Sequence, residues 1–158
     1  MIRPKWNEYF MEIADVVSKR SNCMSRQVAA VIVKENQILA TGYNGTPKGV
    51  TNCCDGGCPR CNNITESGEH LEECLCCHAE ENSICQAAKF GLPINESAMY
   101  CTLMPCLHCS KLIINSGIKK LIYRDVYNEK HQAISSNLLR DGCVEIIRIV
   151  NEDNHDIS

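Results

Sequence analysis

The length, composition and charge of the chain limit what it can be. Its 158 residues fit one domain of ordinary size, and 44% hydrophobic residues suffice for one buried core. The net charge of -3 offers no basic surface for a nucleic-acid backbone, and no run of about 18 apolar residues indicates a membrane span. We therefore expect one domain over residues 1–158, with neither membrane nor nucleic acid as a partner. Because the N-terminus lacks the apolar core of a signal peptide, we expect a cytoplasmic location, with the nucleus as the alternative.

The first part of the chain predicts a helix and a hairpin. Apolar residues between Trp6 and Val17 recur at helical spacing, so residues 4–20 are expected to form an amphipathic helix. Two short β-rich runs, 28–33 and 37–43, are separated by Glu35 and Asn36, which is typical of an antiparallel hairpin.

Residues 44–77 interrupt this regularity. They contain Gly, Asn and Cys but no apolar period, and they are too many for an ordinary loop. We expect this insert to be functional or to be fixed by a metal.

Strands and helices alternate from residue 78 onwards. Glycines, prolines and apolar periodicity delimit the elements and leave a frayed tail at 151–158. The expected helices are 78–90, 105–115 (with Pro105 at its first position) and 133–140, and the expected strands are 98–103, 120–126 and 143–150. This order predicts an α/β fold, a three-layer α/β/α sandwich with a mixed five-stranded sheet.

Two short motifs carry metal-binding chemistry. His78, Cys106 and Cys109 are three ligands suited to zinc, and three protein ligands leave a fourth position for water, as in catalytic zinc sites. Zinc lowers the pKa of such a water to about 7, so hydroxide is available at neutral pH. Glu80 lies two residues after His78, off its helical face, and is expected to transfer protons without binding the metal. His108 lies off the face of the two cysteines and is expected at the surface.

In this order, H-x-E followed by P-C-x-x-C is the signature of the zinc-dependent nucleobase deaminases. The chain resembles one family of them, the deoxycytidylate (dCMP) deaminases of the cytidine deaminase-like superfamily. The resemblance extends over about residues 5–150 and includes the segments 21–24, 41–47, 76–82 and 116–119. It implies hydrolysis of dCMP to dUMP and ammonia for thymidylate synthesis, with a catalytic zinc at His78, Cys106 and Cys109 and with Glu80 as the proton shuttle.

The resemblance also suggests substrate contacts. Asn44 matches the asparagine that contacts the nucleoside in the superfamily, and Ala79 lies between the two active residues of the first motif. Arg26 is a candidate for bidentate contact with the 5′-phosphate, or alternatively a solvated arginine. Tyr123 and Tyr127 are expected either to border the base pocket or to pack in the core.

The segment Gly42, Tyr43 and Gly45 resembles a site for nucleotide effectors. In hexameric members dCTP activates and dTTP inhibits. The resemblance therefore implies a homo-oligomer, a hexamer, with these three residues as allosteric candidates.

Thirteen cysteines exceed the needs of one catalytic site. In a reducing compartment, clustered cysteines favour metal sites over disulfides. By resemblance, Cys23, Cys53 and Cys76 match positions that bind a structural zinc in some relatives, while Cys58 and Cys61 have zinc-knuckle spacing. We expect at least one structural zinc, because metal binding would offset the entropy of ordering the insert. The candidates are Cys23, Cys53, Cys54, Cys58, Cys61, His70, Cys74 and Cys76, in a pairing that stays open; Cys85, Cys101 and Cys143 are expected to be buried thiols.

Two other functions stay open. The first keeps the zinc chemistry but acts on dCTP, a free base or a tRNA adenosine, although a tRNA substrate favours a basic surface stripe. The second is a non-catalytic zinc-binding module, which predicts four protein ligands on every zinc and leaves Glu80 without a role.

Overall fold

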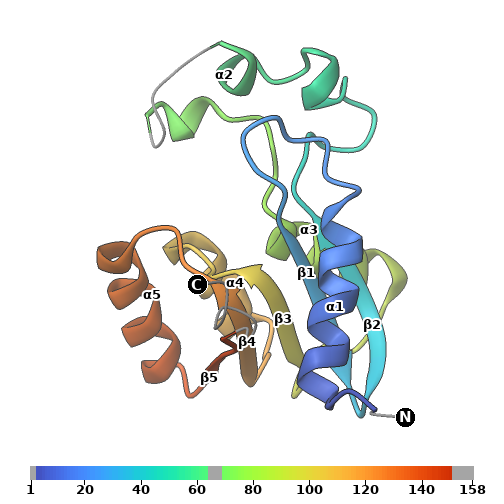
Figure 1. Ribbon diagram of the computed structural model, residues 1–158, viewed down its shortest axis with the longest axis vertical. Helices are drawn as coiled ribbons and strands as arrows, with labels where there is room; N and C mark the ends of the chain where they lie inside the picture. Colours follow the sequence, from blue (N-terminus) through green and yellow to red (C-terminus); the bar gives the residue numbers. More distant parts are fainter. Residues whose placement is uncertain (1–2, 64–68, 151–158) are drawn as a thin grey trace, which may run out of the picture.

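The computed structural model describes residues 3–63 and 69–150 (Figure 1). The tail predicted at 151–158 lies outside the described residues. Among the described residues, no helix is both long enough and apolar enough to cross a membrane.

Five strands form one mixed sheet in the order β2-β1-β3-β4-β5. The strands are β1 (Ala29–Lys34), β2 (Gln37–Tyr43), β3 (Ala98–Leu103), β4 (Lys120–Asp125) and β5 (Glu145–Arg148). Strand β1 is antiparallel to both β2 and β3, whereas β3, β4 and β5 run parallel. The predicted hairpin is confirmed: Glu35 and Asn36 have φ values of 51° and 59°, the left-handed pair that a tight two-residue turn requires.

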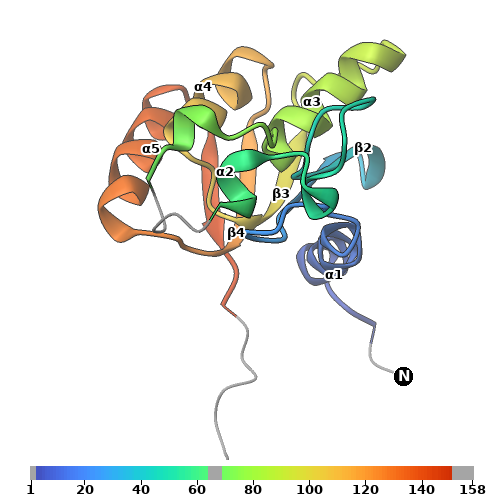
Figure 2. The ribbon, with the colours of Figure 1, turned by 90° about the horizontal axis from the view of Figure 1, so that it is seen from above.

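Helices cover both faces of this sheet (Figure 2). They are α1 (Trp6–Ser18) on one face and α3 (Ala79–Phe90), α4 (Leu107–Asn115) and α5 (Glu129–Asp141) on the other. Alternation along β1 explains the layers, because successive strand side chains point to opposite faces. Val31 packs with Phe10 of α1, whereas Ala30 and Ile32 belong to the core beneath the other three helices. The predicted three-layer sandwich is confirmed.

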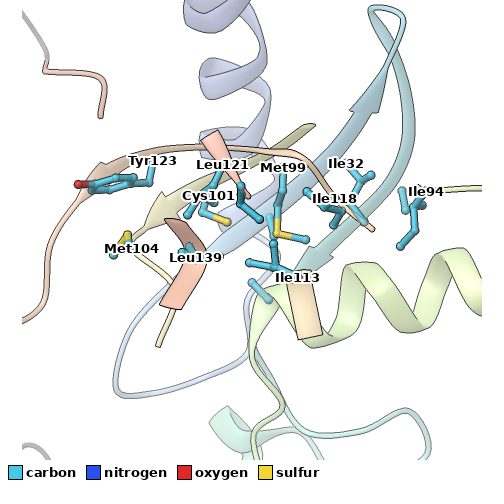
Figure 3. Packing of buried hydrophobic residues seen from close by; sticks show 14 of the residues in the cluster. Ile32, Ile94, Met99, Cys101, Met104, Ile113, Ile118, Leu121, Tyr123 and Leu139 are labelled. Atoms are coloured by element: carbon cyan, nitrogen blue, oxygen red, sulfur yellow. The ribbon is translucent and has the colours of Figure 1, made fainter. Parts of the chain in front are cut away.

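The larger core lies between the sheet and helices α3 to α5 (Figure 3). Ile32, Met99 and Leu121 come from three adjacent strands, and Ile113 and Leu139 reach them from α4 and α5. All five side chains are buried. This core therefore fixes the N-termini of α3 and α4, which lie at one end of the sheet.

Two predicted boundaries in the C-terminal part of the chain were wrong. Helix α5 begins at Glu129 and not at 133, because its first turn is polar and gives no apolar signal; the side chain of Asn128 accepts a hydrogen bond from the Lys130 N–H at 2.9 Å. Strand β5 covers only Glu145–Arg148, since Cys143 has a φ of 56° and ends the preceding turn. Cys101 is buried as expected, but Cys85 and Cys143 are exposed.

The insert lies beyond the end of the sheet near the start of α3 and has little regular structure (Figure 1). It contains α2 (Pro59–Asn62) and two short 3-10 helices, Cys53–Asp55 and Leu71–Glu73. Its core consists of sulfur atoms in place of aliphatic side chains: Cys53, Cys58 and Cys76 are buried, and Cys23, Cys61 and Cys74 pack against them.

Candidate active site

Three of the predicted metal ligands meet at the starts of two helices. His78 is the N-cap of α3, Cys106 is the N-cap of α4, and Cys109 lies in the first turn of α4. The Nδ1 atom of His78 lies 3.5 Å from Sγ of Cys106 and 3.4 Å from Sγ of Cys109. Zn–N and Zn–S bonds of the usual lengths place such atoms about 3.5 Å apart around a tetrahedral zinc. The donor set therefore fits a zinc ion.

Helix α4 begins later than predicted. Its first residue is Leu107, and Pro105 is a buried residue that precedes the N-cap. Cys106 and Cys109 therefore converge as N-cap and third helical residue, not as two positions on one helical face. This arrangement lets the N-cap side chain turn back over the first turn of the helix, where Cys109 lies.

A capping interaction orients His78. The backbone N–H of His78 donates to Glu81 Oε2 at 2.6 Å, and Glu81 Oε1 lies 3.0 Å from Nε2 of His108. The expected surface position of His108 is thus observed, since its side chain is 64% exposed and points to Glu81. We did not assign a role to Glu81 from the sequence, although an acidic residue three positions after an N-cap is a recognisable capping signal.

The charges in this centre favour metal binding. A hydrogen bond from Cys109 and the neighbouring His78 ring lower the pKa of Cys106 to about 3 against the effect of burial, which favours the thiolate form of Cys106. The hydrogen bond to Cys106 raises the pKa of His78 to about 9. The hydrogen bond with Cys106, together with burial, raises the pKa of Cys109. A dication between the two sulfurs would favour the deprotonated form of both cysteines.

Glu80 is a buried carboxyl group beside this centre. Its side chain is 4% exposed, and burial raises the pKa of Glu80 to about 7. A carboxyl group with a pKa near neutrality can both accept and release a proton at the pH of the cell.

A cavity of about 770 Å³ opens onto these residues. That volume is typical of small-molecule sites. His78, Glu80 and Cys106 line it together with residues from the loop before β1, the end of the insert and the connection from β4 to α5.

Asn44 lines the cavity and also holds a loop in place. Its Oδ1 accepts hydrogen bonds from Ser21 Oγ at 2.7 Å and from the Val28 N–H at 2.8 Å, and its Nδ2 donates to the Arg26 carbonyl at 2.7 Å. A primary amide has two N–H donors, so among the described residues one of them is left for a bound molecule.

Arg26 and Tyr127 form the outer part of the cavity wall. The Arg26 guanidinium lies over the Tyr127 ring, 4.6 Å from its centroid, and both residues line the cavity. Tyr123, in contrast, is buried in the larger core, where its hydroxyl accepts a hydrogen bond from Gln132. Of the two tyrosines, only Tyr127 borders the cavity.

The segment considered for effectors has close packing contacts. A Cβ atom at Gly42 would lie 2.1 Å from the carbonyl oxygen of Ala79, and one at Gly45 would lie 2.5 Å from Asn22 Oδ1. The carbonyl of Tyr43 accepts a hydrogen bond from Asn82 at 2.8 Å. Helix packing therefore accounts for the glycine at 42.

Six of the eight structural-metal candidates lie close together in groups of sulfur atoms, and two do not. Cys54 is exposed, with its Sγ 3.8 Å from Asp55 Oδ1. His70 lies near Glu72 and Glu73 in an exposed group of its own. The remaining six sulfurs form two close groups, Cys23, Cys53, Cys61 and Cys76 in one and Cys58, Cys61, Cys74 and Cys76 in the other.

Sequence analysis missed part of the cavity wall. Leu75 from the insert and Asn128, Gln132 and Ser135 from the start of α5 line the cavity. Nothing in their spacing distinguishes them from ordinary surface residues, since the fold alone brings α5 beside the two helix N-termini.

Comparison with known proteins identifies a family with this arrangement of residues. Residues 4–125 match the family described as "Cytidine and deoxycytidylate deaminase zinc-binding region". The deoxycytidylate deaminases of Schizosaccharomyces pombe and Saccharomyces cerevisiae are each 46% identical, over 96% and 80% of this chain. The chain spans only 46% and 40% of their respective lengths.

A solved structure covers nearly the whole chain. The dCMP deaminase of cyanophage S-TIM5, in complex with dCMP and dUMP, superimposes with a TM-score of 0.76 at 35% identity. The match covers 94% of this chain and 100% of the phage chain.

Proposed function

Because the chain belongs to the cytidine and deoxycytidylate deaminase family, we propose that it converts dCMP and water to dUMP and ammonia, supplying dUMP for thymidylate synthesis. One observation carries this proposal: a buried carboxyl group, Glu80, adjoins a centre of three ligands at the wall of a nucleotide-sized cavity. The 35% identical phage enzyme, which was solved with dCMP and dUMP, supports the choice of substrate.

The residues of the site divide the chemistry between them. His78, Cys106 and Cys109 would hold zinc, which supplies a Lewis acid with an open fourth position and a water of pKa about 7. Glu80 takes the first proton from the attacking water and passes it to ring atom N3 of the base. It then takes the second proton from the new hydroxyl at C4 and passes it to the amino group, so that ammonia leaves and C4 becomes a carbonyl. Asn44 and Ala79, which both line the cavity, would contact the nucleoside, Asn44 through its second amide N–H.

The two ends of the nucleotide have distinct sites in this proposal. The base lies against the metal centre, and the 5′-phosphate lies at the cavity rim near Arg26, whose guanidinium offers paired donors. The stack on Tyr127 restricts the Arg26 side chain, so less freedom is lost when the phosphate binds.

The remaining parts of the proposal concern the location, assembly and regulation of the protein and the metal content of its insert. We place it in the cytoplasm or nucleus as a homo-oligomer, a hexamer by family resemblance. We also propose that dCTP activates it and dTTP inhibits it, which requires that the two nucleotides favour different states. For the insert we propose at least one structural zinc.

Ammonia release from dCMP, CMP, dCTP, cytosine and tRNA tests the substrate directly, with Cys109→Ser as the inactive control. We expect turnover of dCMP at a kcat/KM at least tenfold above the other substrates. Preference for dCTP, a free base or tRNA would refute the proposed substrate. A protein without turnover on any of them, but with four protein ligands on every zinc, would be a binding module.

Regulation is tested in the same assay. We expect sigmoidal saturation by dCMP alone, a nearly hyperbolic curve with dCTP, and inhibition by dTTP. Hyperbolic kinetics insensitive to both nucleotides, or a monomer at assay concentration, would refute the regulatory part without affecting the substrate assignment.

A further inference from the structure

The six sulfurs around the insert form two overlapping groups. Cys23 and Cys53 belong only to the first group, Cys58 and Cys74 only to the second, and both groups contain Cys61 and Cys76. Within each group of four, all sulfur atoms lie within 4.8 Å of one another. Two tetrahedral metal sites that share two ligands, and therefore share one edge, would have this set of six sulfurs.

The sulfur separations within the second group match a tetrahedral zinc site. Sγ of Cys74 lies 3.7 Å from Sγ of Cys61 and 3.9 Å from Sγ of Cys58. Two thiolates on one tetrahedral zinc lie about 3.8 Å apart, given Zn–S bonds of about 2.3 Å. Cys61 also contacts Cys53 of the first group, so its sulfur lies between the two groups.

Backbone and side-chain donors point at these sulfurs. The Met24 N–H lies 3.4 Å from Sγ of Cys53, and the Leu75 N–H lies 3.3 Å from Sγ of Cys58. Outer hydrogen bonds of this kind orient the ligands of a metal site. One such donor serves a cysteine found only in the first group, and the other serves a cysteine found only in the second.

From this arrangement we propose that the six cysteines bind two zinc ions in one binuclear cluster. Cys61 and Cys76 bridge the ions, Cys23 and Cys53 complete the first coordination sphere, and Cys58 and Cys74 complete the second. This cluster is separate from the centre at His78, so each chain holds three zinc ions in all.

A single zinc explains the geometry less well. Cys53 and Cys58 are both fully buried and belong to different groups, so one four-cysteine zinc would leave one of them outside its coordination sphere. Six thiolates around two dications carry a formal charge of minus two, the same as four thiolates around one dication. The second ion therefore binds two more thiolates without adding net charge to the buried cluster.

The cluster ties the insert to the cavity. Cys23 comes from the loop that leads to Arg26, and Cys76 precedes His78 by two residues. Arg26 and His78 both line the cavity. The insert has few aliphatic side chains in its interior, so the free energy of zinc binding is what holds this wall in place.

Metal counting and cadmium NMR test the cluster on the unmodified chain. Native mass spectrometry should find three zinc ions per chain. After replacement by ¹¹³Cd, two of three cadmium signals should show scalar coupling to each other, because shared sulfurs connect those ions through bonds. Two zinc ions per chain, or three uncoupled signals, would overturn the proposal. Neither measurement depends on turnover, so failure of the cluster leaves the dCMP assay unaffected.

Matched variants extend the test. Cys61→Ser should lose two zinc ions, because both sites lose a bridging ligand, and loss of only one would contradict bridging. The control is Cys54→Ser, which changes an exposed thiol next to Cys53 that belongs to neither group and should retain three. Cys109→Ser should lose one zinc and keep the coupled cadmium pair.

Discussion

Gly42 and Ala79 approach so closely that a Cβ atom at position 42 would lie 2.1 Å from the carbonyl oxygen of Ala79 and 2.4 Å from the backbone N of Ser83. Strand β2 thus supports the first turn of α3 directly, backbone against backbone. His78 and Glu80 flank Ala79, so this contact sets the height of both residues above the sheet.

Gly42→Ala should therefore disturb stability and the metal centre together. The added methyl group meets backbone atoms that cannot rotate away, and overpacking of this kind costs about 1–3 kcal/mol or more. We expect a loss of at least about 2 kcal/mol in denaturant unfolding and weaker zinc retention during chelator competition. The control is Thr41→Ala on the same strand, which should cost less than about 1 kcal/mol and leave zinc retention unchanged. Equal effects of the two variants would show that the contact does not matter.

Glu80→Gln should separate chemistry from structure. Glutamine fills nearly the same volume but cannot transfer the proton, so we expect zinc content and melting temperature close to those of the unchanged chain. General acid–base catalysis typically contributes about 10²–10⁴-fold, and we expect kcat for dCMP to fall at least 10²-fold. Retention of more than about a tenth of the rate would contradict the shuttle role.

Arg26→Ala should affect the phosphate end of the substrate alone. We expect KM for dCMP to rise at least tenfold, which corresponds to about 1.4 kcal/mol, with little change in kcat. Turnover of deoxycytidine, which lacks the phosphate, should change less than twofold. Arg20→Ala, at an exposed position in the turn that follows α1, is the matched control and should resemble the unchanged chain. Equal losses for dCMP and deoxycytidine would show that Arg26 supports the loop and does not bind phosphate.

Asn44→Ala should destabilise the loop before β1. The substitution removes three hydrogen bonds and leaves the buried Val28 N–H without its acceptor, at a cost of about 1–3 kcal/mol. We expect thermal unfolding to show this loss and dCMP binding to weaken as well. Asn137→Ala, on an exposed position of α5, should change stability by less than about 0.5 kcal/mol. A stable Asn44→Ala protein with weakened dCMP binding would assign Asn44 to substrate contact alone.

The sequence by itself determined the features that depend on neighbours along the chain. The order of strands and helices after the hairpin predicted the layers, because helices that connect strands of one sheet pack onto its faces. The turn at Glu35 and Asn36 was predictable because two β-rich runs separated by two residues are typical of a hairpin. His78, Glu80 and the pair Cys106 and Cys109 were recognisable because short spacings at helix starts encode their chemistry.

Only the tertiary structure decided which distant groups meet. The insert has no apolar period, so its spacing could not show that Cys61 and Cys76 fall in both sulfur groups while Cys54 and His70 fall in neither. The cavity wall at Tyr127 depends on where α5 packs, which the sheet order fixes. Local patterns record the side of an element that is buried, but long-range contacts follow from how whole layers pack, and that information is distributed over the entire core.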